Sequence, residues 1–199
     1  PLTRLRLSLE LMASDDELTE DMIRDVEDMN AILDQFLAFV RDGSDEPVET
    51  TDLASLIREV VAPYNQQQET VRLCVEPMPP FALRRVSIKR LLVNLIENAL
   101  RYAGGGVEVA AYVSGDQHAP YVVLSVLDRG PGIAPAEMGE IFNPFIRGDR
   151  ARGGRGTGLG LAIVKHVLLR HQGRLDITSA PGRGSCFSCH FPTAQVPGR

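Results

Sequence analysis

The sequence predicts an α+β protein in which a helical hairpin precedes a two-layer α/β sandwich. Over the first 40 residues, apolar side chains recur at steps of three and four, as along one face of a helix. Farther along, short apolar segments typical of strands separate the predicted helices, and the last two form a hairpin across Pro181–Gly184. Helices and adjacent antiparallel strands of this kind are expected to pack as two layers around one core.

The first 42 residues have the apolar spacing of two helices joined by an acidic segment. Ser14 and Glu17 fit a capping box, in which both side chains satisfy N–H groups where the second helix starts. A lone hairpin cannot cover both apolar faces, so we expect two copies to pair into a four-helix bundle, which makes the protein a homodimer. A hairpin packed on its own C-terminal domain is the alternative. The two faces comprise Leu2, Leu5, Leu9 and Met12, then Met22, Val26, Met29, Leu33, Phe36 and Val40.

Residues 43–50 interrupt this spacing with Gly, Pro and acidic side chains, and they are predicted to link the hairpin to a domain at 51–193. The tail at 194–199 is expected to be frayed. Asp52 is placed to cap a helix whose apolar face runs from Leu53 to Val61. The other predicted elements are helices at 86–102 and 158–170, a turn at 77–80, and strands at 71–76, 107–113, 121–127, 175–178 and 186–191.

The composition limits the classes of function. Of 199 residues, 44% are hydrophobic and 24% charged, which is ordinary for a globular protein with one sizeable domain and a smaller one. A formal net charge of −5 argues against a nucleic-acid-binding surface. There is no apolar run of membrane-spanning length and no signal peptide. Because the sequence begins at Pro1 without methionine, we expect further residues upstream, and any membrane attachment would lie there.

The three cysteines suit a reducing compartment. Cys186, Cys189 and His190 match the haem-attachment pattern C-x-x-C-H. However, the segment alternates like a buried strand, which places residues three apart on opposite faces. The same geometry disfavours a zinc pair, so buried strand cysteines are the favoured interpretation.

A glycine-rich segment precedes the last predicted helix. Gly156, Gly158 and Gly160 expose consecutive backbone N–H groups where this helix begins, and a helix start attracts anions. The spacing fits neither the Walker loop nor the dinucleotide-binding fingerprint, and the protein-kinase motifs are absent. Taken alone, the segment is also compatible with a structural turn.

Four segments in order change this interpretation. Asn94–Tyr102, Asp128–Ile133, Ile141–Phe145 and Gly156–Gly160 resemble the N, G1, F and G2 boxes of the histidine-kinase ATP-binding domain. This resemblance implies a Bergerat-type α/β sandwich, the fold of the gyrase, heat-shock-90 and mismatch-repair ATPases. The whole chain resembles the catalytic core of a sensor histidine kinase, with a start similar to the EnvZ-like osmosensor group and PhoR-like features near the C-terminus.

The resemblance implies an ATP and Mg²⁺ site. Asn94 and Asn98 are four apart on one helix, so both side chains are expected to face one cleft, and an amide oxygen suits magnesium. By resemblance, Asn98 ligates Mg²⁺, Asp128 accepts from the adenine amino group, and Gly130 and Gly132 let the base approach the backbone. The implied ATP-binding set is Asn94, Asn98, Arg101, Tyr102, Asp128, Gly130, Gly132, Ile133, Arg147, Gly156, Thr157, Gly158, Leu159, Gly160 and Ser185.

Within this set, the resemblance implies that Arg101 contacts a phosphate group and that Tyr102 contacts adenine. Ser185 is expected to support adenine through its hydroxyl. Arg147 begins a segment that also carries Arg150, Arg152 and Arg155. A mobile cationic loop beside a triphosphate is expected to act as a lid, because guanidinium groups pair with phosphate oxygens.

The implied reaction transfers the γ-phosphoryl group of Mg-ATP to a hairpin histidine and then to an aspartate of a response-regulator receiver domain. By resemblance, that histidine lies five positions before Pro1. None of His118, His166, His171 and His190 has its setting, so this chain is expected to bind nucleotide and dimerise but not to autophosphorylate. The expected location is the cytoplasmic portion of a bacterial inner-membrane protein.

Two other functions stay open. One is a dimeric nucleotide-sensing scaffold without transfer activity. The other is an ATP-driven clamp, which Asn94 disfavours because related ATPases carry a glutamate there that activates water. An amide cannot accept that proton, so we expect slow hydrolysis.

Overall fold

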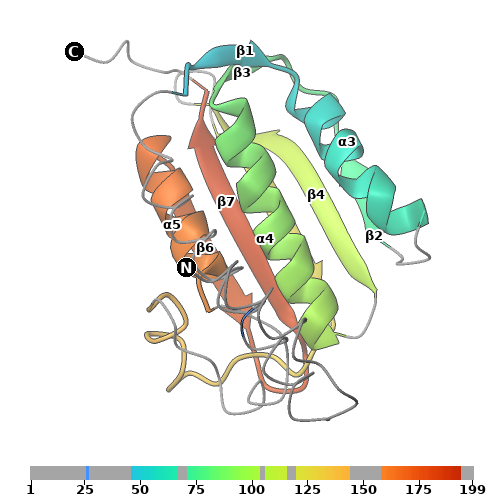
Figure 1. Ribbon diagram of the computed structural model, residues 1–199, viewed down its shortest axis with the longest axis vertical. Coiled ribbons are helices and arrows are strands. Elements are labelled where there is room, and N and C mark those ends of the chain that lie inside the picture. The colour runs from blue at the N-terminus through green and yellow to red at the C-terminus, as the bar shows by residue number, and fades with distance from the viewer. Residues whose placement is uncertain are drawn as a thin grey trace, which may run out of the picture.

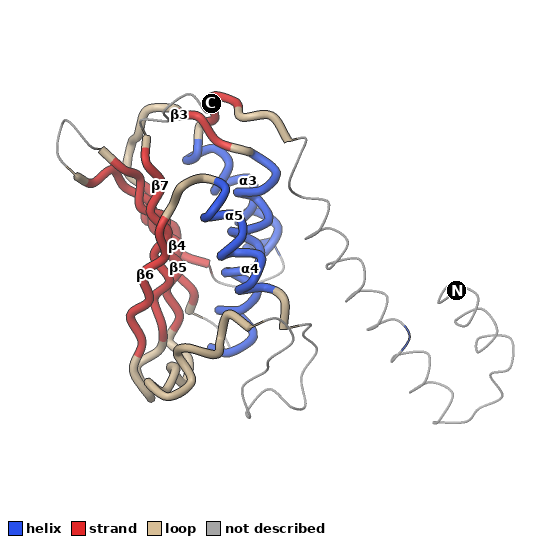
Figure 2. Tube along the Cα trace, turned by 90° about the vertical axis from the view of Figure 1, so that its left-hand side faces the viewer, coloured by secondary structure: helices blue, strands red, loops and turns tan. Residues whose placement is uncertain are grey.

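The computed structural model describes residue 26 and residues 46–66, 71–103, 106–115, 120–143 and 158–193. Within these ranges, a five-stranded sheet carries helices on one face (Figures 1 and 2), which confirms the predicted α/β sandwich. Of the predicted hairpin at 1–42, only Val26 is described, and it is helical and buried. The four-helix bundle therefore stays a prediction. The described elements are β1 (Glu49–Thr51), α3 (Leu53–Gln66), β2 (Val71–Val75), β3 (Phe81–Leu83), α4 (Arg85–Ala103), β4 (Val107–Ser114), β5 (Tyr121–Asp128), α5 (Gly160–Arg170), β6 (Arg174–Ser179) and β7 (Ser185–Pro192).

The sheet has the strand order β2-β4-β5-β7-β6. The predicted hairpin across Pro181–Gly184 is the antiparallel pair β6 and β7. The other neighbours are antiparallel as well, except β2 and β4, which are parallel. The reason is the connection: α4 lies between β2 and β4 in sequence, and a helical crossover returns the chain in the same direction. A second, two-stranded antiparallel sheet pairs β1 with β3.

The core lies between the sheet and the helices. The strand register aligns five side chains in one row across the sheet, and the helices cover this face. Figure 1 shows α4 across the middle, with α5 on the side of β6 and α3 on the side of β2. Four consecutive inward positions of α4 are at most 2% exposed, so this helix is the centre of the core. The row is Leu73, which is 36% exposed on the edge strand β2, then Val109, Val126, Phe187 and Ile177, and the α4 positions are Leu91, Leu92, Leu95 and Ile96.

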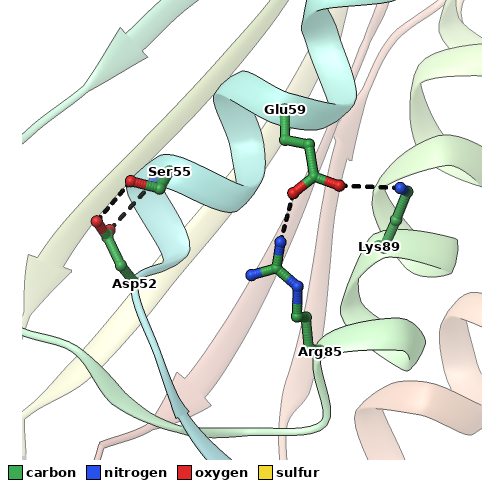
Figure 3. A network of polar contacts seen from close by, with 5 residues as sticks. All are labelled: Asp52, Ser55, Glu59, Arg85 and Lys89. Carbon is green, nitrogen blue, oxygen red and sulfur yellow. Dashed lines mark hydrogen bonds and ion pairs between the residues drawn. The ribbon is translucent and has the colours of Figure 1, made fainter.

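The predicted cap of α3 is confirmed. Asp52 Oδ1 accepts from the backbone N–H of Ser55 at 3.1 Å, and Oδ2 accepts from its hydroxyl at 2.6 Å. Figure 3 shows that Glu59, one turn farther along α3, reaches both Arg85 and Lys89 of α4. These side chains are about half exposed, so the ion pairs orient the two helices more than they stabilise them.

The two neighbouring cysteines lie on opposite faces of β7, as the strand alternation predicts. Cys189 is buried on the helix-covered face, beside Leu124 and Leu175 in register. Burial raises the pKa of the Cys189 thiol well above its usual range. Cys186 stands on the other face and is partly exposed. The two sulfur atoms therefore cannot hold one haem or one zinc ion together.

His171 follows α5 directly and is buried between α5 and the start of α4. Its Nδ1 lies 2.7 Å from the carbonyl oxygen of Val167, and its Nε2 accepts from the backbone N–H of Arg84 at 3.1 Å. Because a carbonyl only accepts, the proton is on Nδ1, and the neutral ring makes both bonds. Burial lowers the pKa of His171, although the Val167 bond acts in the opposite direction.

The folding stability should therefore fall as the pH drops below the unfolded-state pKa of His171, about 6.5. Below that pH the unfolded chain takes up a proton that the folded chain refuses, so the free energy of unfolding decreases by at most about 1.4 kcal/mol per pH unit for this one group. Urea unfolding of wild type and His171→Gln at pH 7.5, 6.5 and 5.5 measures this slope. We expect a shallower slope in the variant; equal slopes in both proteins would contradict the assignment.

Candidate nucleotide-binding site

Asp128 provides a buried carboxylate at one end of the sandwich. It ends β5, it is 6% exposed, and the sheet register places it opposite Ser185 of β7. Its Oδ1 accepts two backbone N–H groups, from Gly130 at 2.8 Å and from Ser185 at 3.2 Å. Both bonds involve the same oxygen, so the described contacts leave Oδ2 available to accept from a ligand.

The loop after Asp128 packs backbone against backbone on the turn between β6 and β7. Gly182 donates its N–H to the carbonyl oxygen of Pro131 at 2.7 Å. Gly132 has φ +70°, and a Cβ atom there would lie 2.0 Å from the carbonyl oxygen of Ala180. Gly184 has φ +79°, and its Cβ would lie 2.1 Å from the carbonyl oxygen of Asp128. Only glycine fits such approaches, so these glycines fix the loop beside the carboxylate.

A hydroxyl network supports the same loop. Ser179, at the end of β6, accepts from the backbone N–H of Ile133 at 2.8 Å and donates to the carbonyl oxygen of Gly184 at 3.0 Å. The hydroxyl of Ser185 lies 2.9 Å from that of Ser179. The sequence analysis missed Ser179, although its register position opposite Ser185 follows from the hairpin turn. The predicted contact of Ser185 with adenine stays a prediction, since here its hydroxyl faces Ser179.

The two asparagines of α4 face the start of α5. Asn94 donates a hydrogen bond from Nδ2 to the carbonyl oxygen of Arg90 at 2.9 Å. This bond does not use its Oδ1, which is an acceptor. A Cβ atom on Gly160 would lie 3.0 Å from this Oδ1 and 3.5 Å from Nδ2 of Asn98. Both amides therefore adjoin the first residue of α5.

The start of α5 lies beside these two amides. Leu159 is its N-cap residue and provides no side-chain hydrogen bond, and Gly158 before it has φ +70°. The first N–H groups of a helix without a side-chain cap bind anions well. Leu159 itself is 2% exposed, which anchors this helix start to the core.

The end of α4 adjoins the same loop. A Cβ atom on Gly130 would lie 3.0 Å from the carbonyl oxygen of Tyr102, whose side chain is 44% exposed. In Figure 1, the end of α4 and the turn between β6 and β7 lie at the lower end of the molecule, and Asp128 at the end of β5 pairs with Ser185 at the start of β7. Arg101 is exposed there, and the described contacts do not join it to the other site residues.

The described contacts place most of the predicted set in two groups. Asn94, Asn98 and Gly160 adjoin one another, as do Tyr102, Asp128, Gly130, Gly132, Ile133 and Ser185. Three predicted site residues lie outside the described residues, namely Arg147, Gly156 and Thr157, together with the other arginines of the predicted lid. Of the F-box segment, residues 141–143 are described, and Lys165 of α5 lies 5.7 Å from the centre of the Phe142 ring.

The donor set fits Mg-ATP. The Asp128 carboxylate suits an amino group, the α5 start suits phosphate, and the amide of Asn98 can offer magnesium one oxygen. Among the residues that the structure describes, no three His, Cys, Asp or Glu side chains form a metal cluster. A magnesium ion held mainly by phosphate oxygens and water needs no such cluster.

No helix in the described ranges is both long and apolar enough to cross a membrane.

Residues 84–195 match the family model of histidine kinase-, DNA gyrase B-, and HSP90-like ATPases. Over 158 residues, the chain is 36% identical to the phosphate regulon sensor protein PhoR of Pseudomonas aeruginosa. This match covers 77% of this chain and 35% of PhoR. The solved histidine kinase domain of the E. coli osmosensor EnvZ is 32% identical, with a TM-score of 0.59, and the match covers 79% of this chain and 96% of that one. Both groups expected from the sequence thus occur among the matches.

The chain also shares its fold with full-length ShkA, which was solved in complex with AMPPNP. The two are 24% identical with a TM-score of 0.71, and the match covers all of this chain and 46% of ShkA. This chain spans 35% of the length of PhoR and 40% of that of the SenX3 kinase of Mycolicibacterium smegmatis. The chain belongs to the histidine kinase-, DNA gyrase B- and HSP90-like ATPase family, and its relatives are sensor histidine kinases of the PhoR and SenX3 type.

Proposed function

We propose that this chain is the ATP-binding catalytic core of a sensor histidine kinase. The γ-phosphoryl group of Mg-ATP passes to a histidine of the protein and then to an aspartate of a response-regulator receiver domain. The observation that carries the nucleotide assignment is the Asp128 carboxylate, which two backbone N–H groups hold by one oxygen. The family match and the sensor-kinase relatives support the transfer.

Asp128 selects the base in this proposal. Its free carboxylate oxygen accepts from the exocyclic amino group of adenine. Guanine carries a carbonyl oxygen at the equivalent position, and two acceptors repel each other. Gly130 and Gly132 keep the backbone beside this carboxylate free of side chains. We also assign Tyr102 and Ile133 to the adenine end, by their places next to this loop.

The phosphate end is assigned to the start of α5 and the facing side of α4. The first backbone N–H groups of α5 bind phosphate oxygens, because the N-cap residue Leu159 provides no side-chain hydrogen bond there. Asn98 contributes one oxygen to Mg²⁺, and the exposed Arg101 is assigned to a phosphate group. Arg147, Gly156 and Thr157 complete the phosphate end by their positions in the family motif.

Asn94 favours phosphoryl transfer over an ATP-driven clamp. Its amide oxygen faces Gly160 and its amide nitrogen is engaged by Arg90. An amide has no capacity to take a proton from water, so bound ATP is protected from hydrolysis until a nucleophile reaches it. Among the described residues, the buried His171 does not serve as this nucleophile, because both of its ring nitrogens are occupied.

Substituting Asn98 should weaken binding only when magnesium is present. We expect Asn98→Ala to lower the affinity for Mg-ATP about tenfold, equal to about 1.4 kcal/mol, because one metal ligand is lost. The affinity for ATP in EDTA should stay within about twofold. Titration calorimetry of both proteins with and without Mg²⁺ gives all four constants. An equal loss in both conditions would contradict the metal role.

Phosphotransfer is tested with the full-length protein and γ-labelled ATP. We expect acid-labile label on the protein, its transfer to a purified receiver domain, and little free phosphate without that domain. Binding without any label would favour a nucleotide-sensing scaffold, and rapid phosphate release without label would favour a clamp. Sedimentation velocity of the full-length protein, before and after deletion of residues 1–42, tests the proposed homodimer through the hairpin.

A further inference from the structure

Glu46 caps a helix to which it does not belong. Its Oε1 accepts from the backbone N–H of Val86 at 2.6 Å, and its Oε2 accepts from that of Ser87 at 3.1 Å. The hydroxyl of Ser87, which is 1% exposed, also donates to Oε2. The first turn of α4 contains no acidic residue of its own. Among the described residues, Glu46 therefore supplies the carboxylate that stabilises this helix start, and it lies 40 positions before Val86.

Arg84 extends the contact to the second nucleotide-facing helix. Its side chain donates to the backbone oxygen of Glu46, and its backbone N–H donates to Nε2 of His171 at 3.1 Å. His171 directly follows α5, whose first residue, Gly160, adjoins Asn94. One cluster thus ties Glu46 to both helices that form the phosphate end of the proposed site.

We infer that Glu46 is a latch that fixes the connection between residues 1–45 and the ATP-binding domain. This inference rests on the proposed function. Residues 1–45 join the domain through Glu46, and the next regular contact along the chain is β1, which begins at Glu49. With the latch closed, the helices that bind the nucleotide hold the connection directly. Glu46 is then a positioning residue for phosphoryl transfer, and it touches neither nucleotide nor acceptor.

The expected size of the effect follows from the length of the tether. The predicted linker starts at residue 43. With the latch closed, the tether comprises the three residues before Glu46; with the latch open, it comprises the six residues before β1. The effective concentration of a tethered group falls roughly as the −3/2 power of the length, so doubling the tether lowers it about threefold. The acceptor should therefore meet the bound nucleotide about threefold less often when the latch is open.

The test uses full-length protein carrying Glu46→Ala. At saturating ATP, the initial rate of histidine phosphorylation should fall about threefold, with KM for ATP unchanged. Glu46→Gln keeps one oxygen acceptor and should give an intermediate rate. Glu49→Ala is the matched control, because Glu49 is an exposed acid of β1 whose described contacts involve only its backbone. The rate of this variant should equal that of wild type. Amide exchange at Val86 and Ser87 should be about tenfold faster in Glu46→Ala only.

A wild-type rate in Glu46→Ala would overturn the latch, as would a KM that rises in proportion to the loss of rate, since nucleotide binding itself would then have changed. Unchanged exchange at Val86 and Ser87 would show that the cap does not hold in solution and would also overturn it. If wild-type protein binds no nucleotide, the proposed function fails by itself. The exchange readout distinguishes the two failures, because it requires no nucleotide.

Discussion

Asp128→Asn should reduce the affinity for ATP by about 10- to 100-fold while the domain stays folded. The substituted amide keeps an oxygen for the N–H groups of Gly130 and Ser185, so the loop retains its support. The same amide presents N–H₂ where Oδ2 stood, and two donors then face each other at the adenine amino group. A hydrogen bond to a charged group contributes about 1.5–3 kcal/mol, which corresponds to this loss.

Titration calorimetry with Mg²⁺ and a non-hydrolysable ATP analogue measures this loss. Asp176→Asn is the control, because Asp176 is an exposed strand carboxylate of β6 that pairs with Arg174 and lies outside the site. It should bind like wild type. Thermal melting of both variants should stay near the wild-type midpoint. Unchanged affinity in Asp128→Asn would remove the base-selecting role of Asp128.

Gly184→Ala should destabilise the domain by about 3–5 kcal/mol, a large part of the total stability of a typical domain. Two causes add up. An alanine at φ +79° costs about 1–2 kcal/mol in backbone conformation. Its Cβ would also lie 2.1 Å from the carbonyl oxygen of Asp128 and 2.9 Å from the Cα of Arg129, so the backbone itself must move. Urea unfolding measures the loss.

The same turn provides the control for this prediction. Gly182 has φ +75°, but a Cβ atom there would meet nothing within 4 Å. Gly182→Ala should therefore cost only about 1–2 kcal/mol, the conformational part alone. Similar losses in the two variants would show that the close approach to Asp128 is not what requires glycine at position 184.

Local patterns predicted the parts of the fold that depend on neighbours in sequence. Asp52 precedes an apolar helical stretch and caps it. Strand alternation separated Cys186 from Cys189 correctly, and the turn at 181–184 joins β6 to β7. The spacing of Asn94 and Asn98 placed both amides on one side of α4, and the structure shows the start of α5 there.

Contacts between distant segments were beyond such patterns. β3 is only three residues long, too short to show alternation, and the segment around it was predicted as a turn or left unassigned. The parallel direction of β2 depends on where α4 packs. Ser179 gained its role from the register of the hairpin.

Glu46 is a further case, since it was predicted as part of a linker at 43–50. It contacts the start of α4, and Glu49 belongs to β1, so residues 46–50 are attached to the domain. An acidic residue beside a proline resembles linker composition, and only the fold brings it to a helix 40 positions away. The part of the linker before residue 46 lies outside the described residues, and the domain boundaries stay predictions.

Chemical-shift mapping of the labelled chain tests the central claim most directly, which is that Mg-ATP binds at the end of the sandwich where Asp128 and the start of α5 lie. With Mg²⁺ and a non-hydrolysable ATP analogue, we predict that the largest amide shifts occur at Gly130, Gly132, Gly158 and Gly160. The amides of Glu59 and Asp176 should not move. Saturating nucleotide that shifts no amide in these loops, or that shifts the amides of Glu59 and Asp176 instead, would contradict the account.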